Sequence, residues 1–465
     1  MSFEDIPVDV GVVYEGERIR WPDTHIELGG PRADYKFELV RTKSMDEVDD
    51  GKITIIGPDI KDVEPGTTLS FGVLVEVAGK EIEEDLEGVI ERRIHEYVNY
   101  IQGFMHLNQR YDIHMRLSKA SVKKGMDSFD FVGKVILRLY KMDMPLIEKI
   151  QITFLTDADK VEEMYAEARK VYEARDARAR GMKDEEADVF YGCSLCQSFA
   201  PTHVCTITPQ RYANCGAISW FDGRAASRID PKGPIFDVVK GECLDDWTGE
   251  YSGVNEMSNE KTLGAVKRVQ LYTAFGYPHT SCGCFEAVAF YIPEVDGLGI
   301  VDRDFRGKTI NGLPFSTIAD TTAGGTQVDG FHGLSLEYMR SPRFLQVDGS
   351  WNRIVWTPKK VKERVHDFIP EELIDKISTE EDVSSVEELR QFLEEKGHPV
   401  VERWAAMAEA EAAAEAEALA EAPVAAQAFG PIPTMSATMG GFRIILENAR
   451  IHADKIIIRR LEKKG

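Results

Sequence analysis

Seven cysteines limit what this 465-residue chain can fold into more than any other feature of its sequence. They stand at positions 193, 196, 205, 215, 243, 282 and 284, so all of them fall in one stretch of the chain. Such clustering rarely arises by chance, and the spacing is therefore interpreted as chemistry. The chain begins MSFEDIPVDV, without the basic region or apolar run of a secretory signal. We expect a cytoplasmic protein, whose reduced cysteines bind metal or take part in catalysis.

Composition narrows the class of protein further. Hydrophobic residues make up 43% of the chain and charged residues 29%, which is typical of globular proteins. No run of 18 apolar residues is present, so we expect no membrane span. The net charge of −23 argues against nucleic acid as a partner, because phosphate backbones need a basic surface. The length predicts two to four domains.

Helical and strand patterns alternate in the first third of the chain, which predicts a mixed α/β domain over residues 1–158. The apolar spacing predicts helices over 85–107 and 129–140 and strands over 52–57, 67–77 and 150–155. Residues 159–188 are strongly charged with a helical pattern, and they are expected to form a connecting helix.

The remainder of the chain predicts an α+β domain over residues 189–400 that carries the cysteines. Further strands are expected at 287–293, 297–301 and 353–356, whereas the glycine-rich residues 323–326 lack the rest of a phosphate-binding motif and predict a turn. An Ala/Glu/Pro linker is expected over 401–433. The tail 434–465 is apolar enough to dock on another surface, either as a strand pair or as a helix. The fold class is α/β, with several domains.

The first four cysteines follow the pattern C-x2-C-x8-C-x9-C, which is typical of a metal site. A structural zinc site usually brings two close pairs of cysteines, and only one pair is present here. A [4Fe–4S] cluster takes one thiolate per iron and accepts single cysteines. The spacing favours iron–sulfur over zinc and leaves zinc open.

The tripeptide Cys282-Gly283-Cys284 suggests a second kind of metal site. Two thiolates one residue apart, together with backbone nitrogens, can surround one ion in a square N2S2 plane, which suits Ni(II) or Cu(II). Glycine between them removes the side chain that would crowd this ring. The alternative is a tight turn with two buried thiols.

The cysteine segments resemble acetyl-CoA synthase, in particular the archaeal β subunits of acetyl-CoA decarbonylase/synthase complexes. The resemblance covers roughly residues 85–399 and includes Arg92-Arg-Ile-His95 and Gly103-Phe-Met-His106. Its most specific parts are Cys193-Ser-Leu-Cys-Gln-Ser-Phe-Ala-Pro-Thr-His-Val-Cys205, Cys215-Gly-Ala-Ile-Ser-Trp220 and Tyr277-Pro-His-Thr-Ser-Cys-Gly-Cys-Phe-Glu286.

The resemblance implies a [4Fe–4S] cluster bridged to a binuclear nickel centre. The cluster ligands implied are Cys193, Cys196, Cys205 and Cys215. Cys196 is also implied to reach the proximal nickel, and Cys282 and Cys284 to bridge both nickel ions, with the backbone nitrogens of Gly283 and Cys284 completing the distal plane. Phe199 matches an aromatic residue over the open face of the proximal nickel. Cys243 matches no ligand position.

The activity implied is the synthesis or cleavage of acetyl-CoA from CO, CoA and a methyl group carried by a corrinoid iron–sulfur protein. CO dehydrogenase subunits and corrinoid iron–sulfur protein subunits are the expected partners, and the C-terminal tail is expected to tether the chain to them. Two alternatives remain: an electron-transfer or scaffold subunit with only a [4Fe–4S] cluster, and a structural zinc protein.

Binding of the CoA phosphates is expected in the first domain. Residues 92–141 contain ten Lys/Arg and four Asp/Glu, in contrast to the acidic chain as a whole. We expect the phosphates to bind Arg92, Arg93, Arg110 and Arg116. The alternative is a set of helices with solvated basic side chains.

Overall fold

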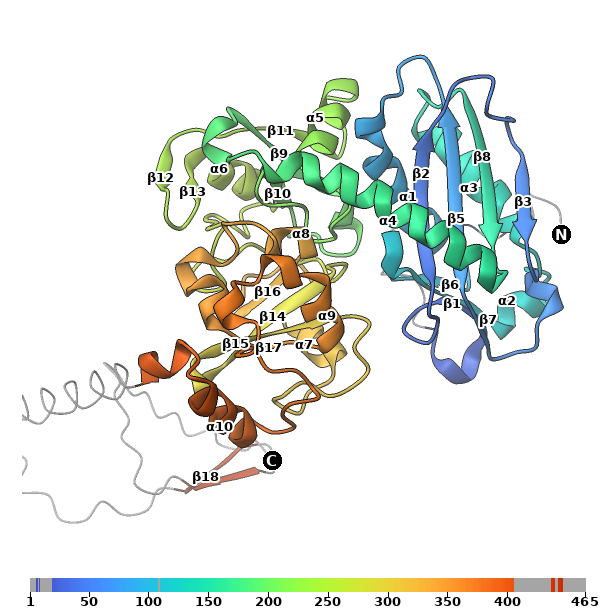
Figure 1. Cartoon of the computed structure of the whole chain (residues 1–465). Helices are drawn as coiled ribbons and strands as arrows, with labels where there is room; N and C mark the ends of the chain where they lie inside the picture. Colours follow the sequence, from blue (N-terminus) through green and yellow to red (C-terminus); the bar gives the residue numbers. More distant parts are fainter. Residues whose placement is uncertain are drawn as a thin grey trace, which may run out of the picture. The chain divides into compact units, whose positions relative to one another are not determined.

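The computed structural model describes Ile6, Val8, residues 19–107 and 109–404, and two short strands near the C-terminus. The chain divides into two compact units, Met1–Trp404 and Ala405–Gly465. The first unit is mixed α/β, as the sequence predicts, and is drawn from blue to orange in Figure 1. In the part of the chain that the structure describes, no helix is both long and apolar enough to cross a membrane.

Most of the helices of the first unit are short, and α4 is the longest. They are α1 (Glu87–Asn99), α2 (Lys119–Lys123), α3 (Phe129–Asp143), α4 (Ala158–Arg180), α5 (Trp220–Ile229), α6 (Ser252–Lys261), α7 (Phe315–Thr322), α8 (Leu336–Met339), α9 (Lys359–Arg364) and α10 (Val386–Lys396).

The strands belong to separate small sheets. They are β1 (Thr24–Gly29), β2 (Lys36–Thr42), β3 (Ile53–Ile56), β4 (Thr67–Leu69), β5 (Phe71–Ala78), β6 (Phe104–His106), β7 (His114–Ser118), β8 (Lys149–Leu155), β9 (Val189–Cys193), β10 (Cys205–Ile207), β11 (Ile235–Val239), β12 (Cys243–Asp245), β13 (Glu250–Tyr251), β14 (Ala287–Ile292), β15 (Gly297–Asp302), β16 (Phe331–Leu334) and β17 (Ile354–Trp356).

The sheet β2-β5-β8-β3 is the central layer of the N-terminal region. Alternate side chains of these strands face opposite ways, because side chains alternate along a strand. Val73 and Val75 join the core under α1 and α3, whereas Phe37 and Leu39 pack with Ala168 of α4 on the other face. Helices therefore cover both faces of this sheet (Figure 1).

The second N-terminal sheet, β4-β1-β7-β6, shares the same apolar core. The predicted helix over 85–107 is too long, since α1 ends at Asn99 and β6 follows it. Gly103 lies between them with φ +83°, and a Cβ there would meet the Ser121 side chain at 1.7 Å. This left-handed glycine turns the chain from the helix into the sheet.

The cysteine-bearing half, residues 189–404, contains the sheets β10-β9-β11 and β16-β14-β15-β17. The three strands predicted here are confirmed as β14, β15 and β17. Residues 323–326 form the predicted turn, in which Gly324 and Gly325 both have positive φ.

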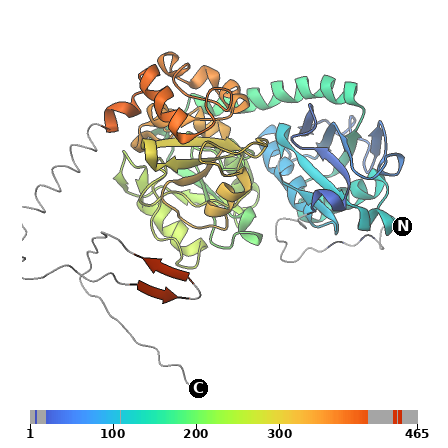
Figure 2. The same cartoon turned by 90° about the horizontal axis from the view of Figure 1, so that it is seen from below.

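The first unit continues to Trp404. Residues 400–404 are helical, and the indole nitrogen of Trp404 donates to the carbonyl of Val295 at 2.6 Å. In the second unit, β18 (Ser436–Met439) pairs with β19 (Phe442–Ile445) as an antiparallel hairpin, visible in Figure 2. The strand-pair alternative therefore holds for this part of the tail, and the rest of the predicted linker and tail lies outside the described residues.

Candidate metal centre

Three of the predicted ligands bring their sulfur atoms together. Cys196 lies in the 3-10 helix η7 (Leu195–Ser198), and Cys282 and Cys284 lie in the loop that leads into β14. The three sulfur atoms lie within 4.8 Å of one another. Cys196 and Cys282 are thus adjacent in space although they lie 86 positions apart in sequence. Three converging sulfur donors are a candidate site for a soft metal ion.

The other three cysteines of the predicted cluster lie together near Cys196. Cys193 ends β9 and faces Cys205, the first residue of β10, as a directly paired residue of the sheet. Cys215 packs in the same buried cluster as these two. The strands β9 and β10, the helix η7 and the loop before α5 therefore bring the four cysteines of the C-x2-C-x8-C-x9-C pattern into one region.

Backbone contacts hold the two cysteine loops against each other. The amide of Glu286 donates to the carbonyl of Asn214 at 3.1 Å, and the Asn214 side chain donates to the carbonyl of Thr280 at 3.0 Å. Gly283 has φ +108°, a region that favours glycine, and its carbonyl accepts a hydrogen bond from Arg303. The glycine of the tripeptide is thus required by the backbone of the loop.

The thiols differ in acidity. Hydrogen bonds from Cys282 and Cys284 hold the pKa of the Cys196 thiol well below its ordinary value, and the charge of Arg92 lowers it further. Burial raises the pKa of Cys205 to about 12 and also raises that of Cys193. In the metal-free chain the Cys196 thiol therefore becomes a thiolate more readily than the thiols of Cys193 and Cys205.

A buried chain of hydrogen bonds ends at this site, and none of its members is among the predicted site residues. Glu38 Oε1 lies 2.5 Å from His106 Nε2, and His106 Nδ1 lies 3.0 Å from His95 Nδ1. His95 Nε2 lies 3.6 Å from Cys284 Sγ. Both histidines stand in motifs that carried the family resemblance, but Glu38 had no signal in the sequence.

A cavity of about 960 Å³ opens onto Cys282 of this trio. Phe199, Cys282 and Gly283 line it, together with Met105 and Arg116. The Phe199 ring packs edge-on against His95, with 5.7 Å between ring centroids. Phe199 therefore lines the cavity and also packs against the buried cluster of Cys196, Ala200 and Cys282.

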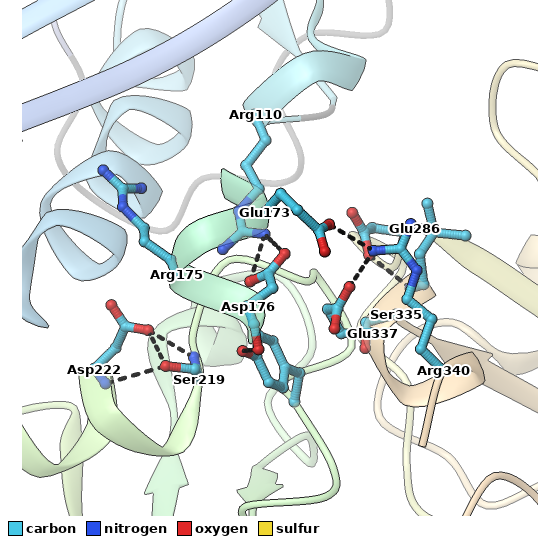
Figure 3. A network of polar contacts seen from close by, with 12 residues as sticks. Arg110, Glu173, Arg175, Asp176, Ser219, Asp222, Glu286, Ser335, Glu337 and Arg340 are labelled. Atoms are coloured by element: carbon cyan, nitrogen blue, oxygen red, sulfur yellow. Dashed lines mark hydrogen bonds and ion pairs between the residues drawn. The ribbon is translucent and has the colours of Figure 1, made fainter. Parts of the chain in front are cut away.

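The structure does not gather the four predicted arginines on one surface. Arg92 is buried, with its Nη2 donating to Cys196 Sγ at 3.2 Å. Arg110 is buried and donates to both carboxylate oxygens of Asp176, at 3.0 and 3.2 Å, inside the polar network of Figure 3. Both arginines are engaged with protein groups in the interior.

The other two arginines lie at different cavities. Arg93 forms ion pairs with Glu96 and Asp143 and lines a separate cavity of about 480 Å³. Arg116 pairs with Glu27 at 2.7 Å and lines the cavity over the cysteine trio. Only Arg116 of the four thus combines a position at this cavity with partial exposure.

Cys243 is exposed and lies apart from the other cysteines.

The residues of this site fit a thiolate-bound metal group. Three sulfur donors converge, and Arg92 Nη1 is buried without a hydrogen-bond partner among the described residues. Unpaired buried donors are rare in folded proteins, and here one lies beside sulfur atoms that become anionic on metal binding.

Two family models match the chain. The one described as "CO dehydrogenase/acetyl-CoA synthase complex beta subunit" matches residues 6–161. The other, which describes the C-terminal part of the ACS/CODH beta subunit, matches residues 172–407.

Curated relatives match along nearly the whole chain. The acetyl-CoA decarbonylase/synthase complex subunit beta of Methanothermobacter thermautotrophicus is 54% identical over 464 residues, which is 98% of this chain and 100% of the relative. Subunit beta 2 of Methanocaldococcus jannaschii is 54% identical over 98% of this chain and 97% of its own length. Subunit beta 2 of Methanosarcina thermophila is 51% identical over 99% of each.

Proposed function

The chain belongs to the β-subunit family of the CO dehydrogenase/acetyl-CoA synthase complex and is an acetyl-CoA synthase, and on this premise we propose how its residues serve that activity. Cys193, Cys196, Cys205 and Cys215 hold a [4Fe–4S] cluster. Cys196, Cys282 and Cys284 would hold one ion of a nickel pair, and the thiolates of Cys282 and Cys284 with the backbone nitrogens of Gly283 and Cys284 would hold the other. When bound, this group supplies the electron-rich nickel at which CO and a methyl group are joined.

One observation carries this proposal most strongly: Cys196 belongs to both cysteine sets. It is part of the four-cysteine pattern, and its sulfur lies within 4.8 Å of those of Cys282 and Cys284. A site for a relay cluster alone needs the first set and leaves the second without a role. A structural zinc site needs neither the single cysteines nor the tripeptide.

The protein controls access to this site. The cysteines are largely buried, and the cavity past Phe199 opens onto Cys282 and Gly283. Substrates therefore arrive from that side, and Phe199 limits the space in front of the sulfur trio. His95, held by His106, supports the opposite edge of the Phe199 ring. We assign Phe199 the role of positioning small ligands such as CO.

The CoA phosphates are assigned to the rim of the same cavity. Arg116 lies there with Arg20 and Arg303, so three guanidinium groups line one opening, and guanidinium groups are well suited to bind phosphate. Of the four predicted arginines, only Arg116 is therefore retained as a ligand of the CoA phosphates. Arg92, Arg93 and Arg110 have internal partners instead and are not assigned to CoA.

The expected partners are CO dehydrogenase subunits and the corrinoid iron–sulfur protein subunits that deliver the methyl group. The family descriptions and the relatives' names, which place those proteins in a complex, support this assignment. The small molecules are CO, CoA and acetyl-CoA. A cytoplasmic location suits thiols that must stay reduced to bind metal, and the described cysteines are free of disulfides.

Metal analysis of the anaerobically purified chain, with an EPR spectrum under CO, tests the proposal. We expect about two nickel and four iron per chain and a CO-dependent paramagnetic signal. Iron without nickel, unchanged after nickel reconstitution and without acetyl transfer, would establish the relay-cluster alternative. Zinc alone would show that the site is structural.

The CoA assignment has its own test. Arg116→Gln removes a rim charge and should raise the KM for CoA severalfold with little change in kcat. Lys124→Gln is the matched control, because Lys124 belongs to the same basic stretch but is exposed in the turn after α2. An unchanged KM in the Arg116 variant would contradict the assignment.

A further inference from the structure

Two buried arginines flank the cysteines, and neither forms an ion pair with a carboxylate of the described residues. Arg92 and Arg211 are each 1% exposed. Among the residues that the structure describes, no carboxylate oxygen lies within 4 Å of either guanidinium. The two other buried arginines of the described residues pair with acids, Arg110 with Asp176 and Arg353 with Asp296.

Arg92 reaches the cysteines from α1. Its Nη2 donates to Cys196 Sγ at 3.2 Å, and its Nη1 has no hydrogen-bond partner among the described residues. Glu96, one turn further along α1, forms its ion pair with Arg93 at 2.6 Å. The charges of Cys196 and Glu96 both act on Arg92, Cys196 more strongly, and the hydrogen bond from Nη2 directs the guanidinium at sulfur.

Arg211 lies in the middle of the loop between Cys205 and Cys215. Its Nη2 lies 3.0 Å from Asn214 Oδ1 and 3.1 Å from His332 Nε2, and its Nη1 lies 3.4 Å from the carbonyl of Thr206. Its Nε has no partner in the described part of the chain. All of these contacts are with uncharged groups, because burial lowers the pKa of His332 well below its ordinary value and keeps that ring neutral.

Neighbouring histidines do not add to this positive charge. His203 Nε2 lies 3.1 Å from Cys205 Sγ, and a His279 nitrogen accepts from the amide of Thr206 at 2.9 Å. A histidine ring carries a positive charge only when it is protonated, whereas a guanidinium group is always charged. The permanent charges nearest the loop of Cys205 and Cys215 are therefore those of arginine side chains.

A buried charge without a counter-charge costs several kcal/mol, so a fold that contains two of them near one site needs compensation. Four thiolates around a [4Fe–4S] core with a charge of 2+ carry a net charge of about 2−. We propose that Arg92 and Arg211 are the counter-charges of this cluster and that they set its reduction potential. The inference rests on the proposed function, since it requires the four cysteines to hold an anionic cluster.

Charge and hydrogen bonding can be separated by paired substitutions. Arg92→Lys and Arg211→Lys keep the positive charge but lose the planar fork, whereas Arg92→Gln and Arg211→Gln lose the charge. Arg353→Gln is the control, because Arg353 is also buried but pairs with Asp296. The measurement is an EPR-monitored redox titration of the full chain carrying its cluster.

Loss of a positive charge disfavours the reduced, more negative cluster, so each Gln variant should have a more negative midpoint potential. We expect at least a tenfold fall in the ratio of reduced to oxidised cluster at a fixed potential, which is about 59 mV for a one-electron couple. The Lys variants and Arg353→Gln should stay close to the wild type. Retention of iron by a Lys variant but not by its Gln counterpart would also support the inference.

Equal shifts in the Lys and Gln variants, or loss of iron from both, would overturn the inference, because the arginines would then act through shape alone. Unchanged potentials in the Gln variants would overturn it too. A second readout uses the metal-free full chain: Arg211→Gln should unfold at the same or a higher temperature than the wild type, whereas Arg353→Gln should unfold at a lower one. Absence of iron from the wild-type chain would instead refute the proposed function.

Discussion

Arg92 donates from Nη2 to Cys196 Sγ at 3.2 Å across 104 positions of sequence. The contact joins α1, in the N-terminal half, to η7 in the cysteine-bearing half. His95, one turn further along α1, also contacts the site: its Nε2 lies 3.6 Å from Cys284 Sγ, and its ring packs against Phe199. One face of α1 therefore forms a wall of the candidate metal centre, so the N-terminal region contributes to this site.

Substitution of single cysteines should distinguish the proposed nickel ligands from the proposed iron ligands. Cys282→Ser should lose most of the nickel but keep the iron, because Cys282 belongs only to the sulfur trio. Cys193→Ser should lose iron, since Cys193 lies with Cys205 and Cys215. The measurement is nickel and iron content per chain after anaerobic reconstitution.

Cys243→Ser provides the control for this series. Cys243 is exposed on β12 and lies outside both sets, so its replacement should leave both metals at the wild-type level. A uniform loss of nickel and iron in all three variants would show that the substitutions act through folding, and the division into two sets would then be wrong.

The glycine of the tripeptide allows a second test. Gly283 has φ +108°, so Gly283→Ala should strain the loop by about 1–2 kcal/mol and weaken nickel binding roughly tenfold. Gly312→Ala is the matched control, because Gly312 also has positive φ (+79°) but lies outside the cysteine tripeptide. Titration of nickel into the iron-loaded chain gives both affinities, and equal affinities in the two variants would contradict the role of Gly283.

Most of the regular structure could be predicted from the sequence because its patterns are local. The alternation in residues 67–77 gave β4 and β5, and the apolar spacing after residue 129 gave α3. The helix beginning near residue 85 was predicted to be too long, because its apolar spacing continues past Asn99 into β6. There a left-handed Gly103, fixed by its packing against Ser121, ends the helical stretch.

The candidate site could be predicted only in part, because the sequence shows local patterns but not contacts between distant residues. Cysteine spacing is local and indicated the metal-binding segments, whereas the convergence of Cys196 with Cys282 and Cys284 was implied only by the family resemblance. A count of basic residues over 92–141 could not show that Arg92 and Arg110 are buried, because their partners, Cys196 and Asp176, lie far along the chain. The link from Glu38 through His106 to His95 likewise depends on tertiary contacts.

This buried link gives a third prediction. His106→Leu removes the partner of the fully buried Glu38, whose Oε2 already has no hydrogen-bond partner among the described residues. The free energy of unfolding of the metal-free chain should fall by roughly 1–3 kcal/mol. His366→Leu serves as the control, because its side chain is 52% exposed and its partner Asp367 is on the surface. Chemical denaturation of both variants measures the difference, and equal losses would show that the buried link adds no stability.

The last prediction concerns Glu286, which follows the cysteine tripeptide and lies in the network of Figure 3. Burial raises the pKa of Glu286 to about 8, although the charge of Arg110 opposes the rise. One carboxyl oxygen accepts from the amide of Leu336 at 2.8 Å. Glutamine can keep that hydrogen bond without titrating, so Glu286→Gln isolates the effect of the charge.

The ordinary pKa of the Glu286 carboxyl is 4.5, and its pKa in the folded chain is about 8. At a pH between these two values the carboxyl is protonated in the folded chain and ionised in the unfolded one. Folding then takes up a proton, so the wild type loses stability as pH rises through this window, by at most about 1.4 kcal/mol per pH unit from this group. The stability of metal-free Glu286→Gln relative to the wild type should therefore rise from pH 5 to pH 8 and level off above. Glu337→Gln is the control, because Glu337 pairs with Arg180 and Arg340 and its loss should destabilise the chain throughout. Urea denaturation at each pH gives the differences, and a constant gap between Glu286→Gln and the wild type would show that Glu286 is already ionised in the folded chain.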